Sequence, residues 1–182
     1  MKNGGFRFAT AAGIADSFSS ASLYIFIPVL LETKGIDLAN TLYFNIIFFA
    51  GYMSGRLGFG RLADRYGTAN VLIASKIAMA ILLLLLILTN GRVAIICLLF
   101  LLGAATRGSS PIIRAMVADS MDDGISFHNA FSVFSSASRG SSALSRPIYG
   151  FLTSYAGIAY VFYMASAVSL CTLYPAVKYK KF

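Results

Sequence analysis

Residue types that build catalytic and metal sites are scarce in this sequence. Its 182 residues include one histidine and two cysteines. The histidine, His128, stands at the mouth of an apolar run, where we interpret it as an interfacial residue rather than a proton relay. The cysteines, Cys97 and Cys171, lie inside apolar runs, so a disulfide framework is not indicated and both are interpreted as packing residues. With no spaced cluster of Cys and His, no Walker loop and no plausible base for a catalytic triad, we expect no metal site, no cofactor and no enzyme activity.

Charged residues are also few, and the sequence is mostly apolar. Only 12% of the residues are charged, 58% are hydrophobic, and the mean hydropathy is +0.75. A soluble domain with a polar surface carries less apolar sequence than this. The net charge of +8 would suggest nucleic acid as the partner of a soluble protein, but the basic residues here lie between and beside apolar runs, where they report membrane topology. The sequence therefore predicts an integral membrane protein that contacts the lipid bilayer and binds no nucleic acid.

Six apolar runs are each long enough to cross a bilayer, which takes about 20 helical residues. The predicted spans are residues 6–31, 40–59, 71–89, 93–117, 128–151 and 156–177. An even number of spans puts both termini on one side, and most Lys and Arg residues fall on that side, so the positive-inside rule makes it cytoplasmic. No linker or low-complexity segment interrupts the chain. We expect an all-α, multi-pass protein of the cell inner membrane, with residues 1–182 forming a single six-helix transmembrane domain.

A short charged stretch, GRLADRYG at residues 60–67, connects the second and third runs. We expect a tight cytoplasmic turn here, with its first and last glycines permitting backbone conformations that a Cβ would obstruct. The stretch resembles the signature loop between the second and third helices of the major facilitator superfamily, which reads roughly G, three residues, D, R, one residue, G and then usually two basic residues. The positions that fit are Gly60, Asp64, Arg65 and Gly67. Thr68 and Ala69 stand where the basic residues are usual.

The resemblance covers roughly residues 8–177 and carries implications for fold and function. Family members usually have twelve helices in two six-helix halves, with the substrate held between them near the midplane. This chain resembles one half, more the second half than the first. The resemblance thus implies a six-helix bundle that is half of a secondary active transporter. It would move a small solute by alternating access against a second six-helix half, supplied by another chain or by a copy of itself. We expect Asp64 and Arg65 to lock the cytoplasmic ends, with Asp119 as a candidate partner of Arg65 or Arg61.

Three charged residues fall near the middle of predicted spans: Asp16, Arg107 and Arg139. Each costs about 2.5–3.5 kcal/mol at that depth, so we expect them to face one another, water or a ligand. Polar residues recur at helical spacing on the first, second, fourth and fifth spans, which predicts that these four line an aqueous path. The residues assigned to the substrate pathway are Asp16, Asn45, Arg107 and Arg139. Two arginines against one aspartate favour an anionic solute, with a coupling ion as a further possibility.

The remaining polar residues of the spans are assigned structural roles. We interpret the serines of the fifth span as packing residues, and Arg114 and Arg146 as anchors that reach the membrane surface. Pro111 predicts a kinked or unwound segment in the fourth span. The third run is expected to contact lipid over most of its surface, with Lys76 extending to the headgroups. The alternative to a transporter is a non-transporting membrane assembly subunit or a truncated remnant of a carrier.

Overall fold

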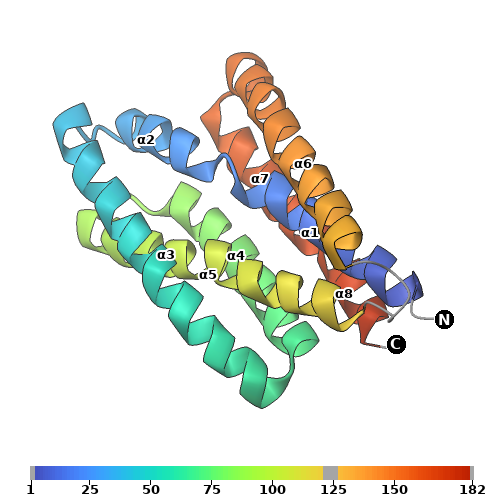
Figure 1. Cartoon of the computed structure of the whole chain (residues 1–182). Coiled ribbons are helices and arrows are strands. Elements are labelled where there is room, and N and C mark those ends of the chain that lie inside the picture. Colours follow the sequence, from blue (N-terminus) through green and yellow to red (C-terminus); the bar gives the residue numbers. More distant parts are fainter. Residues whose placement is uncertain (1–2, 121–126, 181–182) are drawn as a thin grey trace.

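The structure, a computed structural model, describes residues 3–120 and 127–180, and these residues are almost entirely helical (Figure 1). For a few residues inside the helices, Arg107 among them, only the backbone is described. The helices are α1 (Asn3–Ser20), α2 (Leu23–Thr33), α3 (Leu38–Tyr66), α4 (Thr68–Leu88), α5 (Arg92–Asp119), α6 (Phe127–Ala156), α7 (Ile158–Cys171) and α8 (Leu173–Tyr179). Helices α1 and α2 together form the first predicted span, and α7 and α8 form the last. The prediction of an all-α six-helix bundle is confirmed.

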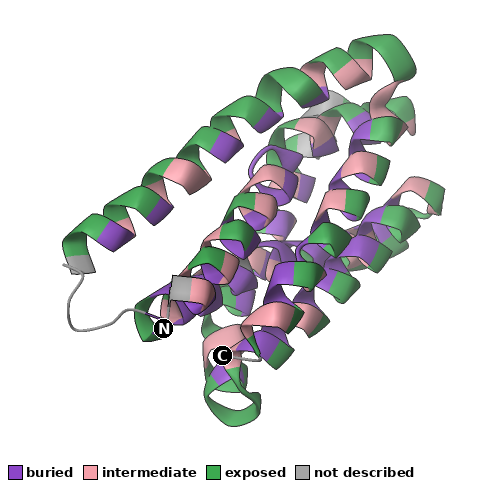
Figure 2. Cartoon of the chain, turned by 90° about the vertical axis from the view of Figure 1, so that its right-hand side faces the viewer, coloured by how far each residue is buried: buried purple, intermediate pink, exposed green. Residues whose placement is uncertain are grey.

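Four stretches of the described residues are both long and apolar enough to cross a membrane. They are Gly4–Thr33, Thr68–Leu88, Arg92–Asp119 and Ile158–Tyr179. Helices α3 and α6, with 29 and 30 residues, are long enough but carry more polar residues. Figure 2 shows α6 along one side of the bundle, exposed over much of its length.

The helix breaks do not occur at prolines. The first span is interrupted between Ser20 and Leu23 and the last at Thr172. In contrast, α5 continues through Pro111, so the unwound segment expected there is absent. A proline ring removes one backbone hydrogen bond, and the surrounding turns hold the helix together.

The predicted turn at residues 60–67 is wrong in its extent. Helix α3 continues to Tyr66, so Gly67 alone separates it from α4. Gly67 has φ +85°, a left-handed conformation that favours glycine, and its amide donates to the Ala63 carbonyl at 2.9 Å. Gly60 lies inside the helix with no heavy atom within 4 Å of where a Cβ would be. Asp64 and Arg65 are therefore helical and exposed rather than parts of a loop.

Helix α4 is central in the bundle, which corrects the expectation that the third run mainly faces lipid. It contacts α3, α5, α7 and α8. One face is buried, and it includes Leu72, Ser75, Lys76, Met79 and Leu83. Two serines of α7 fix the spacing to α4, because Ser169 donates to the Lys76 carbonyl at 3.1 Å and Ser166 to the Ala80 carbonyl at 3.3 Å.

Two apolar clusters fill the bundle, one toward each end. One cluster includes Leu23, Ile27, Phe48, Leu83, Leu99 and Phe162. The other includes Ala9, Leu72, Ile113, Met116, Phe134 and Ala176. The helix positions between them carry buried polar residues, among them Asp16, Lys76, Thr106, Ser109 and Ser169. This polar layer is where the candidate site lies.

Candidate functional site

A buried ion pair crosses the polar layer from α1 to α4. The Lys76 Nζ atom pairs with Oδ1 of Asp16. The hydroxyl of Ser109, on α5, donates to the same carboxylate oxygen at 3.1 Å. Lys76 has no exposed surface, so its ammonium depends on this carboxylate for compensation. The prediction that Lys76 extends to the headgroups is wrong, because the side chain points into the bundle and not along its surface.

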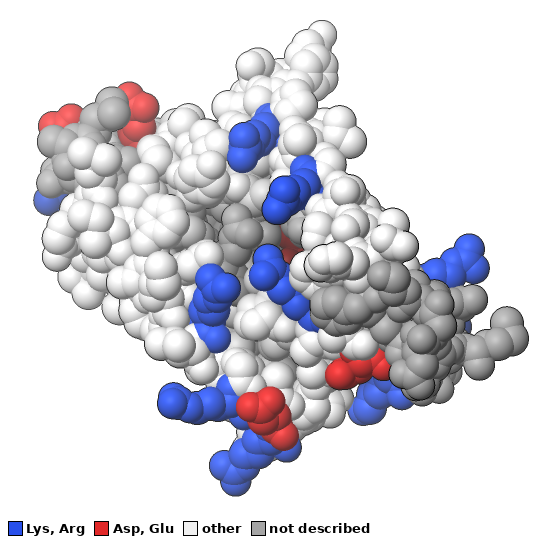
Figure 3. Space-filling model, viewed as in Figure 1, with Lys and Arg blue, Asp and Glu red and all other residues white. Residues whose placement is uncertain are grey.

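Asp16 also lines a cavity of about 180 Å³ between α1, α5 and α6. The other polar side chains on its wall are Ser17, Ser110, Arg114, Ser135, Ser138, Arg139 and Ser142. Gly13, Ile113 and Phe134 complete the lining. Figure 3 shows Lys and Arg side chains gathered around a hollow on this face of the molecule. The cavity is thus a polar depression that opens out of the bundle.

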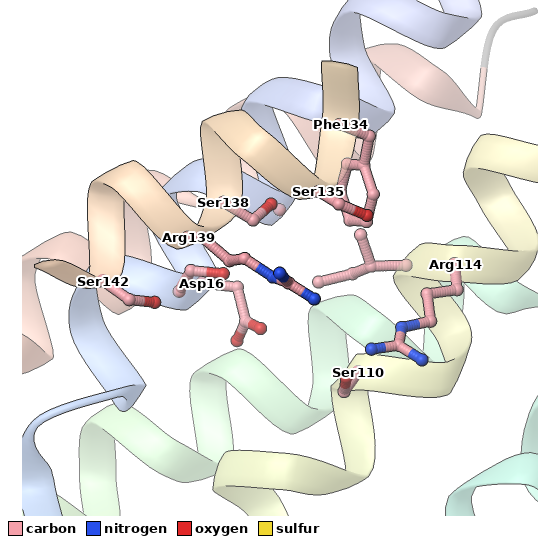
Figure 4. Close-up of a pocket in the computed structure, with 11 residues that line it drawn as sticks. Asp16, Ser110, Arg114, Phe134, Ser135, Ser138, Arg139 and Ser142 are labelled. Atoms are coloured by element: carbon pink, nitrogen blue, oxygen red, sulfur yellow. The ribbon is translucent and has the colours of Figure 1, made fainter. Parts of the chain in front are cut away.

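Two guanidinium groups meet at this cavity from different helices. Arg139 extends from α6 and Arg114 from α5, and Figure 4 shows their side chains reaching toward each other. Within the described part of the chain neither forms an ion pair, and Arg139 is not paired with Asp16. Because Lys76 compensates Asp16, the balance of charge on the cavity wall is positive.

Serine hydroxyls add neutral hydrogen-bonding groups beside the two arginines. The Ser138 Oγ atom is buried and has no hydrogen-bond partner among the described residues. Ser135 and Ser142 lie one turn to either side of it on α6 and also line the cavity. A buried hydroxyl without a partner is costly, so a ligand or water in the cavity would be stabilised by it.

The residues assigned to a pathway from the sequence are only partly brought together. Asp16 and Arg139 share the cavity, whereas Asn45 lies on α3 and is not part of its wall. The Arg107 side chain falls outside the described residues, although its backbone lies on α5 close to Ser109 and Ser110. Arg114, interpreted from the sequence as an anchor, is exposed and lines the cavity. Arg114 and Lys76 are therefore the site residues that sequence reasoning assigned elsewhere.

Asp64 and Arg65, from the charged stretch at residues 60–67, lie at the C-terminal end of α3. Asp64 and Arg65 are exposed there, with the Arg65 guanidinium 5.5 Å from the centre of the Tyr66 ring. Asp119 is exposed at the end of α5. Over residues 3–120 and 127–180 no ion pair joins Asp119 to Arg61 or Arg65. The expected pairing is thus not formed in this conformation.

A comparison with known protein families finds a match. The family model described as Major Facilitator Superfamily matches residues 9–180. The matched region runs from the first turns of α1 to the end of α8 and contains the whole cavity. No curated protein and no solved structure matches the chain.

Proposed function

The chain belongs to the Major Facilitator Superfamily, and from this premise we propose that it moves a small anion across the membrane. Membership makes it a multi-pass integral membrane protein of a family of secondary transporters, which are not enzymes. The observation that carries the anion proposal is the convergence of Arg114 and Arg139 on one cavity without an acidic partner among the described residues.

The chemistry of the cavity wall suits a carboxylate or a phosphate. A guanidinium presents several N–H donors in a plane that matches the oxygens of either group. Ser135, Ser138 and Ser142 offer hydroxyl donors beside Arg139. Once a second half excludes bulk water from the cavity, these charge-assisted hydrogen bonds become stronger than on a protein surface. Phe134 supplies an apolar wall for the remainder of a small organic anion.

A second six-helix half, from another chain or a copy of this one, is proposed to close the cavity. Helix α6 exposes Ser132, Ser136, Arg139, Gly140 and Ala143 on its outer face. A charged residue at that depth is costly against lipid, and small and hydroxyl side chains suit close packing between helices. Rocking of the two halves around the cavity would give alternating access.

Both termini are proposed to lie in the cytoplasm, with the protein in the cell inner membrane. They lie at the end of the bundle that also holds the α3–α4 turn (Figure 1). That end carries Arg61, Arg65, Lys178 and Lys180, and cytoplasmic ends are enriched in basic residues. A Lys180→Cys variant in which both native cysteines are replaced by serine tests this orientation. An impermeant maleimide added to intact cells should leave it unlabelled, and labelling from outside would reverse the topology.

Uptake into vesicles that contain the purified protein tests the function. The probes are radiolabelled inorganic phosphate and succinate, with tetramethylammonium as a cation of small size. We expect uptake of an anion that Arg139→Gln and Arg114→Gln each abolish. Arg146→Gln is the matched control, because Arg146 lies on α6 outside the cavity wall. Undiminished uptake in both cavity variants, or a preference for the cation, would overturn the proposal.

The alternative is a non-transporting assembly subunit or a remnant of a carrier. If the wild-type protein inserts correctly but takes up none of the probes, this alternative is favoured over the anion carrier. Cross-linking in native membranes addresses the partner. A species of twice the mass of the chain supports a pair of identical halves, and a purely monomeric species contradicts that version.

A further inference from the structure

We propose that Lys76 sets the charge preference of the cavity, although it does not contact the solute. This inference rests on the proposed anion transport. Lys76 acts through Asp16, so its role is that of a positioning residue that determines specificity. Without it, the wall would hold a free carboxylate among the groups that bind the anion.

The position of Lys76 supports this role. The side chain comes from α4, which contributes no residue to the cavity wall, and it has no exposed surface. It therefore reaches Asp16 from within the bundle, on the side away from the opening. Its backbone is fixed by the Ser169 hydroxyl, and its Nζ atom also lies 3.8 Å from the Met79 sulfur. Lys76 is thus held where it compensates Asp16 and leaves the cavity volume unoccupied.

Compensation of Asp16 by Lys76 leaves the two arginines of the cavity wall free to bind the anion. Asp16 is the one acidic residue among the described residues that line the cavity. Oδ1 of this carboxylate is occupied by Lys76 and by the Ser109 hydroxyl. An unoccupied carboxylate in a low-dielectric cavity attracts the nearest cation strongly. Removal of Lys76 would therefore turn Asp16 toward Arg139 or Arg114, and would take away a guanidinium that the anion needs.

Binding of inorganic phosphate to the detergent-solubilised full chain is measured by calorimetry. This experiment tests whether Lys76 affects anion binding by compensating the charge of Asp16. Lys76→Met should weaken binding about tenfold or more, whereas Asp16→Asn should tighten it. The double variant Asp16→Asn/Lys76→Met should bind within about threefold of wild type, because both charges are gone. Lys76→Arg should retain binding, and Lys178→Met controls for the loss of a lysine outside the cavity.

These outcomes separate an electrostatic role from a structural one. If Asp16→Asn and Lys76→Met weaken binding equally and the double variant does not recover, Lys76 only supports the fold and the proposal is wrong. The same holds if Lys76→Met binds phosphate as wild type does. If Lys76→Met does not fold, the comparison of Asp16→Asn with the double variant still decides. Tighter binding of phosphate by Asp16→Asn than by the double variant supports the proposal, and equal binding by these two variants contradicts it.

A second measurement does not depend on phosphate binding. Apolar carbodiimides modify carboxylic acids within membranes but not a carboxylate held in an ion pair. Mass spectrometry should find Asp16 unmodified in the wild type and in Arg114→Gln/Arg139→Gln, where Lys76 holds it. Asp16 should also be unmodified in Lys76→Met, where an arginine of the wall replaces the lysine, and modified in Lys76→Met/Arg114→Gln/Arg139→Gln. A modified Asp16 in Arg114→Gln/Arg139→Gln overturns its compensation by Lys76, and a modified Asp16 in a folded Lys76→Met variant overturns the turn toward an arginine. Failure of wild-type protein to bind phosphate, together with the expected labelling, instead counts against the anion proposal and leaves Lys76 as the residue that compensates Asp16.

Discussion

The hydroxyl of Tyr149 donates a hydrogen bond of 3.2 Å to the carbonyl oxygen of Phe18. This carbonyl lies just before the break between α1 and α2, where the regular helix bonds stop. The Tyr149 ring is fully buried and meets the Phe18 ring edge to face at 5.5 Å. A second bond, of 2.7 Å, joins the hydroxyls of Ser22 and Ser145 across the same contact. Side chains of α6 thus satisfy polar groups that the broken first span leaves open.

Replacement of Tyr149 by phenylalanine should lower the free energy of unfolding by about 1–3 kcal/mol. The change retains the buried ring but leaves the Phe18 carbonyl without its donor. Tyr155→Phe is the matched control on the same helix, because Tyr155 is 83% exposed. Denaturation in mild detergent measures the free energy of unfolding of both variants. Equal stability of the two would show that the bond to Phe18 contributes nothing.

Gly103 is predicted to be intolerant of even one added methyl group. A Cβ there would overlap the carbonyl of Phe48, where α5 packs directly on the backbone of α3. Neither backbone can give way easily, so we expect Gly103→Ala to cost about 1–3 kcal/mol. Gly58→Ala on α3 is the control, since it has open space around it and alanine is the better helix former by up to about 1 kcal/mol. Thermal unfolding that ranks the two variants alike would contradict the close packing of α3 on α5.

Gly67 and Gly60 are predicted to differ, although both belong to the charged motif. Alanine at position 67 must adopt a φ near +85°, at a cost of about 1–2 kcal/mol. Alanine at position 60 replaces a helical glycine with open space around it and should stabilise α3. Unfolding measurements on Gly67→Ala and Gly60→Ala separate a single-residue turn from a longer loop. A comparable loss in both variants would favour the loop.

Lys34, which directly follows α2, forms hydrogen bonds to the C-terminal end of α4. Its Nζ atom donates to the carbonyls of Ile87 and Thr89, at 2.8 and 2.7 Å, and to Oδ1 of Asn90 at 3.2 Å. Lys34→Met should lower stability by about 1–2 kcal/mol, because carbonyls at a helix C-terminus lose their donor. Lys178→Met serves as the control. Unchanged stability in Lys34→Met would show that water replaces the ammonium without loss.

The effect of Lys34 should also depend on pH. Burial lowers the pKa of Lys34 from its ordinary value of 10.5. The unfolded chain then holds this proton more tightly than the folded chain, so this group favours the folded state increasingly as the pH rises toward 10.5. The stability difference between wild type and Lys34→Met should therefore widen as the pH rises toward 10.5. A stability difference that narrows as the pH rises toward 10.5 would contradict the lowered pKa.

Hydropathy and spacing were sufficient to predict the helices of the bundle and two members of the cavity. Helix formation depends on local composition, and four of the six apolar runs overlap stretches of the described residues that are long and apolar enough to cross a membrane. Asp16 and Arg139 were predicted to share an interior because charges in a bilayer are costly, and both line the cavity. Arg114 was missed because its place near the end of the span suggested an anchor, whereas its helical register with Ser110 was the informative signal.

The features that the sequence did not predict depend on contacts between residues that are far apart in the sequence. The break after Ser20 contains neither glycine nor proline, and it is stabilised by Tyr149 from another helix. The pairing of Lys76 was not predicted because it is the only charged residue in an apolar run, and its partner is 60 residues away in the sequence. One signal was available. Asp16 and Lys76 are opposite charges inside two spans that enter the membrane from the same side, which makes a pair possible.

The separation of Asp16 and Lys76 along the chain bears on biosynthesis. Ribosomes add about 5–20 residues per second, so the 60 residues between them take about 3–12 s to make. During this interval the carboxylate of the nascent first span has no ammonium from α4 beside it. We therefore expect the first span to be held less firmly in the bilayer until α4 is inserted beside it. Truncated chains that end before α4 should accordingly be substrates for membrane quality-control proteases.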